Sequence, residues 1–344
     1  MAQRRWRKTV FRRAVAALFV VPAMGLAAAC GGGSDPASSP DATITLGFSA
    51  WPGWFPWQVA EEQGLFERNG VDVELKYFDS YTDSLNALAT GNIDANSQTL
   101  NDTLASVSGG AEEKIVLVND NSTGNDQIIA AKGIEDVADL KGRKVAAEQG
   151  TVDHYLLLLA LKKAGLGQDD ITFTPLPTDA AAAAFVAGKV DAVGAFAPFT
   201  TTALGRTGSS VIASSANFPG AIPDHLVVSA ELVERRPDDV QALVATWFDT
   251  LTWIEGHPKE ATTAMAKRAG VSPEDYASYD AGTSIFTLEQ NVEAFTTGDS
   301  ATSLDRQSRD IAAFLVDSGL TDAEPPLDGL LEPRFVQKLA EKTR

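Results

Sequence analysis

The sequence predicts an α/β fold of two similar lobes, each a mostly parallel sheet flanked by helices, joined by two chain crossings that form a hinge. First, strand-like runs alternate with helical patterns from residue 43 on, which is typical of parallel sheets covered by helices. Second, this order of elements occurs twice, and the motif GNIDA at 91–95 recurs as GKVDA at 188–192, as in an internal repeat. Third, a strand-like run at 225–232 is followed by helical patterns to the end of the chain.

The first half of the alternation is expected to build the first lobe. Three β-like runs predict strands there, at 43–48, 71–78 and 93–95. Pro56 suits the first turn of a helix that ends near Gly70, and a second helix with Leu85 and Leu88 on one face ends at Gly91.

The second half repeats this order. Strands are expected at 143–148, 171–176 and 190–196, and helices at 152–165 and 179–188. A chain that builds the second lobe and then returns would finish the first lobe with its helical tail. We therefore expect residues 43–126 with 225–344 to form lobe 1 and residues 127–224 to form lobe 2.

The N-terminal 29 residues have the pattern of a secretory signal peptide. Six Lys and Arg residues and no acid precede a short apolar run, which is too short for a comfortable membrane span. Cys30, the only cysteine, follows three alanines, as in a bacterial lipoprotein signal, although Leu26 lies four residues before it rather than the usual three. We expect Cys30 to be lipidated and residues 30–42 to be a Gly/Ser/Pro tether; a free cysteine is the alternative.

Charge excludes some partners. Without residues 1–29, 22 Lys and Arg stand against 46 Asp and Glu, a net charge of about −24. Such an acidic chain is not expected to bind nucleic acid or to adhere to an anionic lipid surface other than through the lipid on Cys30.

Seven loops are expected to meet where the two lobes face each other, because ligands of open α/β sheets lie beyond the carboxyl ends of the strands. They are residues 49–57, 79–82, 99–102, 119–126, 148–154, 196–199 and 217–225. The first loop holds three tryptophans among Pro52, Gly53 and Pro56. So much aromatic surface beside chain breakers predicts the wall of a binding cleft.

Twelve residues of these loops are candidate ligand contacts: Trp51, Trp54, Trp57, Tyr81, Asn101, Asp102, Asn125, Asp126, Thr151, Asp153, His154 and Phe196. Several have a structural alternative. Trp57 can pack between helix and sheet, Asp126 can satisfy hinge N–H groups, and Asp102 and Asp153 can cap helices. His154 beside Asp153 is more typical of a structural histidine, and no metal site or cofactor is expected.

Residues 139–166 (DLKGRKVAAEQGTVDHYLLLLALKKAGL) and 179–199 (DAAAAAFVAGKVDAVGAFAPF) resemble the binding proteins of ABC importers for nitrate, alkanesulfonates and taurine, and the related thiamine-pyrimidine binding proteins. WPGWFPWQVAEEQGLFERNGVDVEL and STGNDQIIA (122–130) match the same pattern. GWFPW together with GND also resembles a subgroup, encoded beside urea carboxylase, that takes up guanidine-like compounds. The resemblance implies a type II periplasmic-binding-protein fold. It also implies an exported, monomeric receptor, held at the outer face of the cytoplasmic membrane, that delivers a small molecule to an ABC permease and its cytoplasmic ATPase.

The charges of the loops favour a cationic ligand. The loops contain seven carboxylates and no Lys or Arg, only His154 and His225; the carboxylates are Asp79, Asp102, Asp120, Asp126, Glu148, Asp153 and Asp224. Aromatic rings with carboxylates are a typical environment for a guanidinium or amine-type cation. An anion such as an alkanesulfonate, taurine or nitrate remains open, since helix N-termini can bind an anion through backbone N–H groups.

Catalysis is the rival function of another class. A relative of the family makes thiamine pyrimidine with a cysteine-rich stretch, and this chain has no cysteine after Cys30. No G-x-S-x-G motif is present, and the three histidines form no metal-binding pattern. The sequence therefore predicts a binding protein, with no enzyme activity and no metal.

Overall fold

The computed structural model describes residues 43–300 and 302–343. The predicted signal peptide, the tether and the lipid site at Cys30 lie outside these residues. Among the described residues, none of the helices is both long enough and apolar enough to cross a bilayer.

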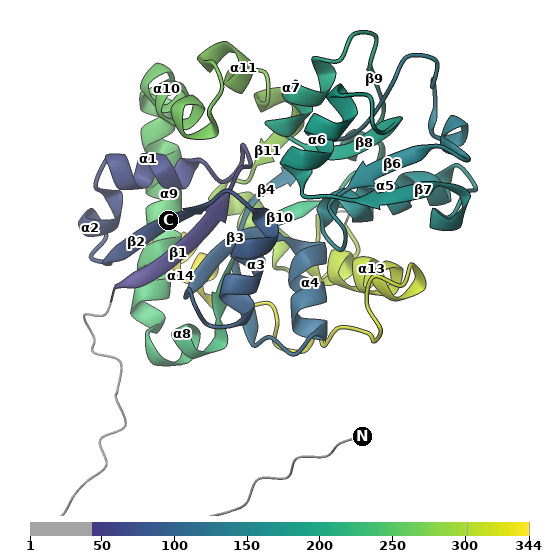
Figure 1. Ribbon diagram of the computed structural model, residues 1–344. Helices are drawn as coiled ribbons and strands as arrows, with labels where there is room; N and C mark the ends of the chain where they lie inside the picture. Colours follow the sequence, from purple (N-terminus) through teal and green to yellow (C-terminus); the bar gives the residue numbers. More distant parts are fainter. Residues whose placement is uncertain (1–42, 301, 344) are drawn as a thin grey trace, which may run out of the picture. The chain divides into compact units, whose positions relative to one another are not determined.

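The first lobe contains a six-stranded sheet in the order β11-β4-β10-β3-β1-β2 (Figure 1). Its strands are β1 (Ile44–Ser49), β2 (Val73–Phe78), β3 (Ala95–Thr99), β4 (Glu113–Ser122), β10 (Pro223–Ser229) and β11 (Thr283–Ile285). The helices between them are α1 (Pro56–Glu62), α2 (Leu65–Arg68), α3 (Tyr81–Ala89) and α4 (Leu100–Ser108). All residues of β3 are buried, as expected for a strand in the middle of a covered sheet.

The second lobe contains a five-stranded sheet in the order β7-β6-β8-β5-β9. Its strands are β5 (Asp126–Ala130), β6 (Lys144–Ala147), β7 (Thr172–Pro175), β8 (Ala192–Phe196) and β9 (Ser210–Ser214). The helices are α5 (Val152–Lys163), α6 (Thr178–Val186) and α7 (Phe199–Leu204), and short 3₁₀ turns lie at Val137–Leu140, Gln168–Asp170 and Ser215–Asn217.

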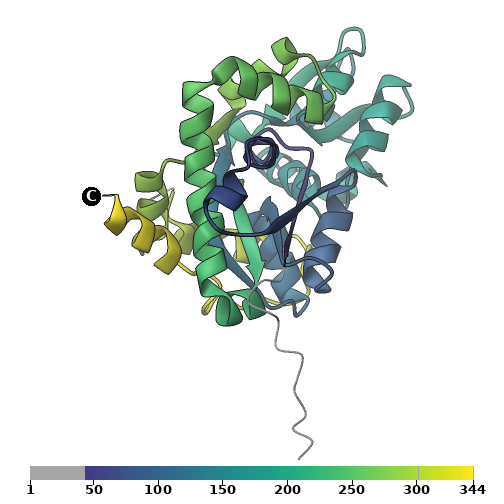
Figure 2. The same ribbon diagram turned by 90° about the vertical axis from the view of Figure 1, so that its left-hand side faces the viewer.

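The chain after β10 is mostly helical, as predicted. It forms α8 (Ala230–Arg235), α9 (Pro237–Gly256), α10 (Pro258–Ala269), α11 (Pro273–Ala277), a 3₁₀ turn at Asp280–Gly282, α12 (Leu288–Ala294), α13 (Leu304–Asp317) and α14 (Arg334–Lys342). The long helix α9 runs beside the first sheet (Figure 2) and packs against α1. Trp247 on α9 is fully buried against Trp57 of α1, with ring centroids 4.7 Å apart.

The two sheets confirm the internal repeat and correct the expected strand directions. In each lobe three parallel strands (β2-β1-β3 and β7-β6-β8) are followed by one strand of opposite direction, β10 or β5, and then by β4 or β9. The sheets are therefore mixed rather than mostly parallel. The reversed strands β10 and β5 are each the first strand after a crossing, because the chain enters that sheet from the other lobe. The edge strand β11 is also reversed, since it pairs antiparallel with β4. The predicted lobe limits remain a proposal.

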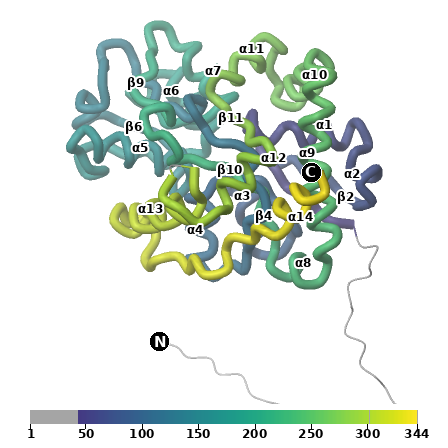
Figure 3. The backbone as a smooth tube through the Cα atoms, turned by 180° about the vertical axis from the view of Figure 1, so that it is seen from behind, coloured from purple at the N-terminus to yellow at the C-terminus, as the bar shows by residue number. Residues whose placement is uncertain are grey.

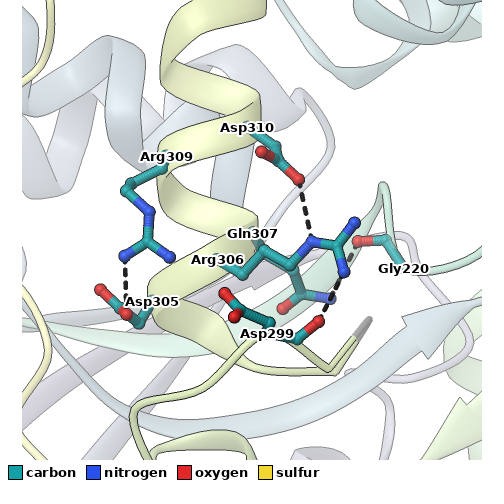
Figure 4. A network of polar contacts seen from close by, with 7 residues as sticks. All are labelled: Gly220, Asp299, Asp305, Arg306, Gln307, Arg309 and Asp310. Atoms are coloured by element: carbon teal, nitrogen blue, oxygen red, sulfur yellow. Dashed lines mark hydrogen bonds and ion pairs between the residues drawn. The ribbon is translucent and has the colours of Figure 1, made fainter.

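Helix α13 belongs to the C-terminal tail but contacts both lobes. It packs against α4 (Figure 3), and Phe314 of α13 lies edge-to-face on Tyr155 of α5 at 5.3 Å. Figure 4 shows the polar contacts of its first turns, where Gln307 donates to the carbonyl of Gly220 at 2.9 Å in the second crossing. The C-terminal tail therefore contacts both lobes and the second segment that connects them.

Candidate functional site: a closed cavity between the lobes

A small cavity lies where the carboxyl ends of the strands of both sheets meet. Nine residues line it, all buried: Trp51, Trp54, Tyr81, Thr99, Asp126, Val152, Phe196, Ile222 and Asp224. Every one of them belongs to one of the seven loops predicted from the sequence. The space open to the centre of a water-sized molecule is about 10 Å³, about enough for one water. The lobes are thus closed on each other, and a larger solute needs the walls to move apart.

Four aromatic rings form most of the wall. Trp51 and Trp54 lie 6.4 Å apart between ring centroids, and Trp54 lies 5.4 Å from Tyr81. Phe196 of the second lobe completes the group, at 6.4 Å from Trp51 and 6.1 Å from Tyr81. Because one ring comes from the opposite lobe, the aromatic wall is complete only when the lobes are closed.

The turn that carries Trp51 and Trp54 is held tightly against a carboxylate. The Trp54 N–H donates to the Trp51 carbonyl at 3.0 Å, which closes the turn around Pro52 and Gly53. A Cβ atom on Gly53 would lie only 1.9 Å from Oδ2 of Asp120. The indole N–H of Trp51 donates to Oδ1 of the same carboxylate at 3.0 Å. Only glycine fits here, so this glycine and Asp120 together fix the direction of the Trp51 ring.

Three buried aspartates stand at the cavity without basic partners. Oδ2 of Asp126 and of Asp224, which line it, and Oδ2 of Asp120, which lies behind Trp51, accept no hydrogen bond from the described residues. Burial raises the pKa of Asp126 to about 7 and that of Asp224 well above its usual range. The Nε1 donor of Trp54 is also buried and has no hydrogen-bond partner among residues 43–300 and 302–343. These groups are the polar atoms that a bound solute could satisfy.

A chain of hydrogen bonds connects the lobes beside the cavity. The hydroxyl of Thr82 in the first lobe donates to Oε1 of Glu148 in the second. The hydroxyl of Thr178 lies 2.8 Å from Oε2 of Glu148 and 2.6 Å from Oδ2 of Asp153. Burial and the neighbouring carboxylates raise the pKa of Asp153 well above its usual range. This network stabilises the closed arrangement of the lobes and does not line the cavity.

Five of the twelve predicted contact residues line the cavity: Trp51, Trp54, Tyr81, Asp126 and Phe196. Their role in binding remains a prediction. The cavity also has four lining residues that the prediction omitted, Thr99, Val152, Ile222 and Asp224. All four lie in the predicted loops, but Val152 and Ile222 are plain aliphatic residues that carry no sequence signal of their own.

The other seven predicted residues do not line this cavity, and their role in binding also remains a prediction. Trp57 is in the core, where it donates to Ser97 at 2.9 Å and stacks on Phe66. Asn101 donates to Asp102 at 2.8 Å, and Asp102 accepts from the hydroxyl of Thr99 at 2.7 Å. Asp102 is in the first turn of α4, where Thr99 is the N-cap and its hydroxyl accepts from the backbone N–H of Asp102.

The other predicted residues outside the cavity have structural partners too. Asn125 donates to the carbonyl of Tyr279 and to the hydroxyl of Thr283, both at 2.7 Å. Thr151 donates to the Glu148 carbonyl at 3.0 Å, and Asp153 lies in the Thr178 network described above. His154 stacks on Phe173 at 4.5 Å and points away from Asp153, with Nε2 at 2.5 Å from Gln168.

No Lys, Arg or His lies among the nine lining residues. Among the described residues, no group of three or more His, Cys, Asp or Glu could hold a metal ion. The available chemistry is therefore that of aromatic faces, carboxyl groups, the hydroxyls of Tyr81 and Thr99, and the indole N–H of Trp54.

Two lobes of this strand order, with a cavity walled from both, define the architecture of periplasmic-type binding proteins. The chain belongs to the NMT1-like family, whose sequence pattern matches residues 37–270. A Brucella abortus (strain 2308) protein named as a binding protein is 30% identical over 213 residues, 61% of this chain and 66% of that protein. The alignment thus spans just under two thirds of that relative.

Two relatives of Escherichia coli have names that include a ligand. A protein named as aliphatic sulfonates-binding is 28% identical over 79% of this chain and 83% of its own length. The taurine-binding periplasmic protein is 24% identical over 70% and 78%.

Solved structures agree with the fold. The alkanesulfonate-binding protein SsuA of Xanthomonas axonopodis pv. citri, bound to MOPS, superposes with a TM-score of 0.72 at 21% identity, over 87% of this chain and 99% of that one. The desulfurization enzyme DszB superposes with a TM-score of 0.62 at 19% identity, over 88% of this chain and all of that one. At these identities the likeness shows a shared fold and leaves the activity open.

Proposed function

We propose that this protein is the solute-binding component of an ABC importer and that the cavity between its lobes holds the solute. The observation that carries this proposal is the wall itself, in which loops from both sheets bring three aromatic rings of one lobe against Phe196 of the other. Closure of two lobes around a solute is the motion that such a wall requires. The names of the E. coli relatives support the same class.

The same relatives favour an anion over the guanidinium-type cation expected from the loop charges. Their names specify aliphatic sulfonates and taurine, and they give no support to a guanidine-like ligand. Three helices also begin at the cavity, with Tyr81 starting α3, Thr99 preceding α4 and Val152 starting α5. Backbone N–H groups at helix N-termini can bind a sulfonate without any basic side chain.

The carboxyl groups favour a ligand that also carries a cationic nitrogen. Asp126 and Asp224 present oxygens without donors to the cavity, and no basic side chain is there to balance them. A purely anionic solute would meet these carboxyls unfavourably unless they are protonated. Taurine has an ammonium group as well as a sulfonate, so it fits both the names of the relatives and the charges of the wall. We therefore rank a taurine-type aminosulfonate first and a guanidinium-type cation second.

The proposal includes an extracytoplasmic location and an ABC permease with its ATPase as partners. The lipid anchor on Cys30 and the monomeric state are parts of the same proposal. Enzyme activity of the DszB kind is not favoured by the relatives, whose names are those of binding proteins.

A thermal-shift screen tests the function and the ligand class together. Taurine, ethanesulfonate, nitrate and guanidinium are compared at equal ionic strength, and a ligand at 100 times its Kd adds about 2.7 kcal/mol to the unfolding free energy. Trp54→Phe should weaken the response to the winning compound, whereas Trp253→Phe, in a helix away from the cavity, should not. Stabilisation by taurine but not by ethanesulfonate supports the aminosulfonate. Stabilisation by guanidinium alone supports the second candidate, and no stabilisation by any of the four contradicts both ligand classes.

A further inference from the structure

Asp120 and Asp224 face each other at the place where the two crossings meet the first sheet. Asp120 lies near the end of β4, from which the chain leaves for the second lobe, and Asp224 lies at the start of β10, on which it returns (Figure 1). The two residues are direct partners in the antiparallel pairing of β4 with β10. Their carboxyl groups are within hydrogen-bonding reach of each other.

Both carboxyl groups are almost completely buried, with 0% of Asp120 and 1% of Asp224 exposed. The indole Nε1 of Trp51 donates to Oδ1 of Asp120 at 3.0 Å, and one oxygen of each carboxyl accepts no hydrogen bond from the described residues. The described residues form no ion pair with either. Two ionised carboxylates at this separation, buried and without a cation, repel strongly, so one of them must hold a proton.

The titratable groups packed around the pair supply no positive charge that could take the place of that proton. Asp126 on β5 and Asp102 on α4 act on Asp224 with the same sign of charge, and Tyr276 on α11 faces Asp120. His225 follows Asp224 on β10, where the register with β4 shifts, and neither of its ring nitrogens has a hydrogen-bond partner among the described residues. Burial also lowers the pKa of His225 to about 3, so it is neutral.

We propose that Asp120 and Asp224 form a proton-binding site, in which a single proton is shared between the two carboxyls at neutral pH. Asp224 is the donor and Asp120 the acceptor, since Asp120 already accepts the indole N–H of Trp51. The shared proton connects the strands on which the chain leaves and re-enters the first sheet. It also lowers the negative charge that a solute meets, because Asp224 lines the cavity and Asp120 does not. The site goes beyond the proposed transport function and does not depend on the identity of the solute.

The sign of the expected pH effect follows from burial. A carboxyl whose pKa is higher in the folded than in the unfolded protein stabilises the fold while it is protonated, and this contribution is lost as the pH rises through the folded-state pKa. An amide at either position cannot ionise and still supplies a donor and an acceptor. Asp224→Asn and Asp120→Asn should therefore keep at high pH the stability that the wild type loses.

The test is the melting temperature of the full chain between pH 5 and pH 9, without ligand, for the wild type, both variants and the control Asp322→Asn in an exposed loop. We expect the difference in Tm between each pair variant and the wild type to grow in favour of the variant as the pH rises, with no such trend for the control. A difference that stays constant over this range for both Asp224→Asn and Asp120→Asn would overturn the proposal. Because no solute is used, the outcome is separate from that of the ligand screen. If Asp224→Asn does not fold, Asp120→Asn decides by the same criterion.

Discussion

The hydroxyl of Tyr276 donates to the backbone carbonyl of Pro52 at 2.9 Å, across 224 residues of sequence. Tyr276 lies on α11 in the C-terminal tail, and Pro52 lies in the turn that carries Trp51 and Trp54. Three residues later, the hydroxyl of Tyr279 is 2.7 Å from the hydroxyl of Thr201 in the second lobe. One short segment of the tail therefore holds the tryptophan turn and also contacts the opposite lobe.

Tyr276→Phe should loosen the tryptophan turn. The change removes the hydroxyl and leaves the buried Pro52 carbonyl without its donor, which costs about 1–3 kcal/mol of unfolding free energy. We expect weaker solute binding as well, since the Trp51 and Trp54 rings lose a fixed position. Denaturant unfolding and ligand titration of the same preparation measure both effects. An unchanged affinity together with reduced stability would limit Tyr276 to a purely structural role.

Gly53→Ala should reduce both stability and solute affinity, although it adds only one methyl group. The new methyl group would occupy the position of Asp120 Oδ2, so the aspartate must move and release the indole of Trp51. Such overpacking typically costs about 1–3 kcal/mol. Gly256→Ala is the matched control, because a Cβ there meets no atom within 4 Å. Equal stability and equal affinity of the two variants would contradict the tight contact described at Gly53.

Tyr279→Phe and Thr82→Val each remove one hydrogen bond between the lobes, to Thr201 and to Glu148 respectively. Both bonds join the two lobes in the arrangement described, so their loss should favour a more open one. We expect a several-fold rise in the Kd of the solute, with a larger radius of gyration of the ligand-free protein in solution scattering. Variants with wild-type Kd and wild-type scattering would show that these bonds contribute nothing to closure.

Trp54→Ala and Trp57→Ala should separate binding from stability. Trp54 lines the cavity, whereas Trp57 is fully buried against Trp247 and Phe66. Trp57→Ala should therefore destabilise the fold by about 3–5 kcal/mol, while Trp54→Ala should mainly weaken solute binding. Urea unfolding and titration calorimetry on each variant make the comparison. A greater loss of affinity than of stability for Trp57→Ala would contradict its placement in the core.

His225 predicts a pH effect of opposite sign to that of the aspartate pair. Burial lowers its pKa to about 3, and neither ring nitrogen has a partner among the described residues. The folded-state pKa lies below the unfolded value near 6.5, so stability is complete above that pH and is lost as the pH falls toward 3. His225→Leu should show a smaller loss of Tm than the wild type between pH 7 and pH 4. Parallel Tm curves for the two proteins would contradict a neutral buried histidine.

The repeat and the edge at which the cavity lies could be predicted from the sequence. Strand-like runs recur with the same spacing around GNIDA and GKVDA, and ligands of such sheets lie beyond the carboxyl ends of the strands. For this reason all nine lining residues belong to the predicted loops. The sequence patterns do not predict the strands β4, β5, β9 and β11, although β4 is ten residues long. The directions and partners of these strands depend on the path of the chain between the lobes, and the local sequence pattern does not specify that path.

The individual contact residues were harder to predict, because neighbouring side chains of one loop point in different directions. Trp54 and Trp57 are three residues apart, yet one faces the cavity and the other the core. Asp102 and Asp153 look equivalent to Asp126 by type and position. In the structure, however, Asp102 accepts a hydrogen bond from Thr99, and Asp153 accepts one from Thr178. Asp224 belongs to a predicted loop, and its importance became visible only through its strand pairing with Asp120.

Titration calorimetry of the full-length protein with taurine, alongside Trp54→Ala, tests the central claim most directly. The proposed function predicts saturable binding of one taurine per chain, with a Kd raised at least tenfold by Trp54→Ala and unchanged by Trp253→Ala. Binding that is unaffected by Trp54→Ala would show that the solute does not occupy the cavity between the lobes. If neither taurine nor any compound of the thermal-shift screen binds, the proposal of a receptor for such solutes is wrong.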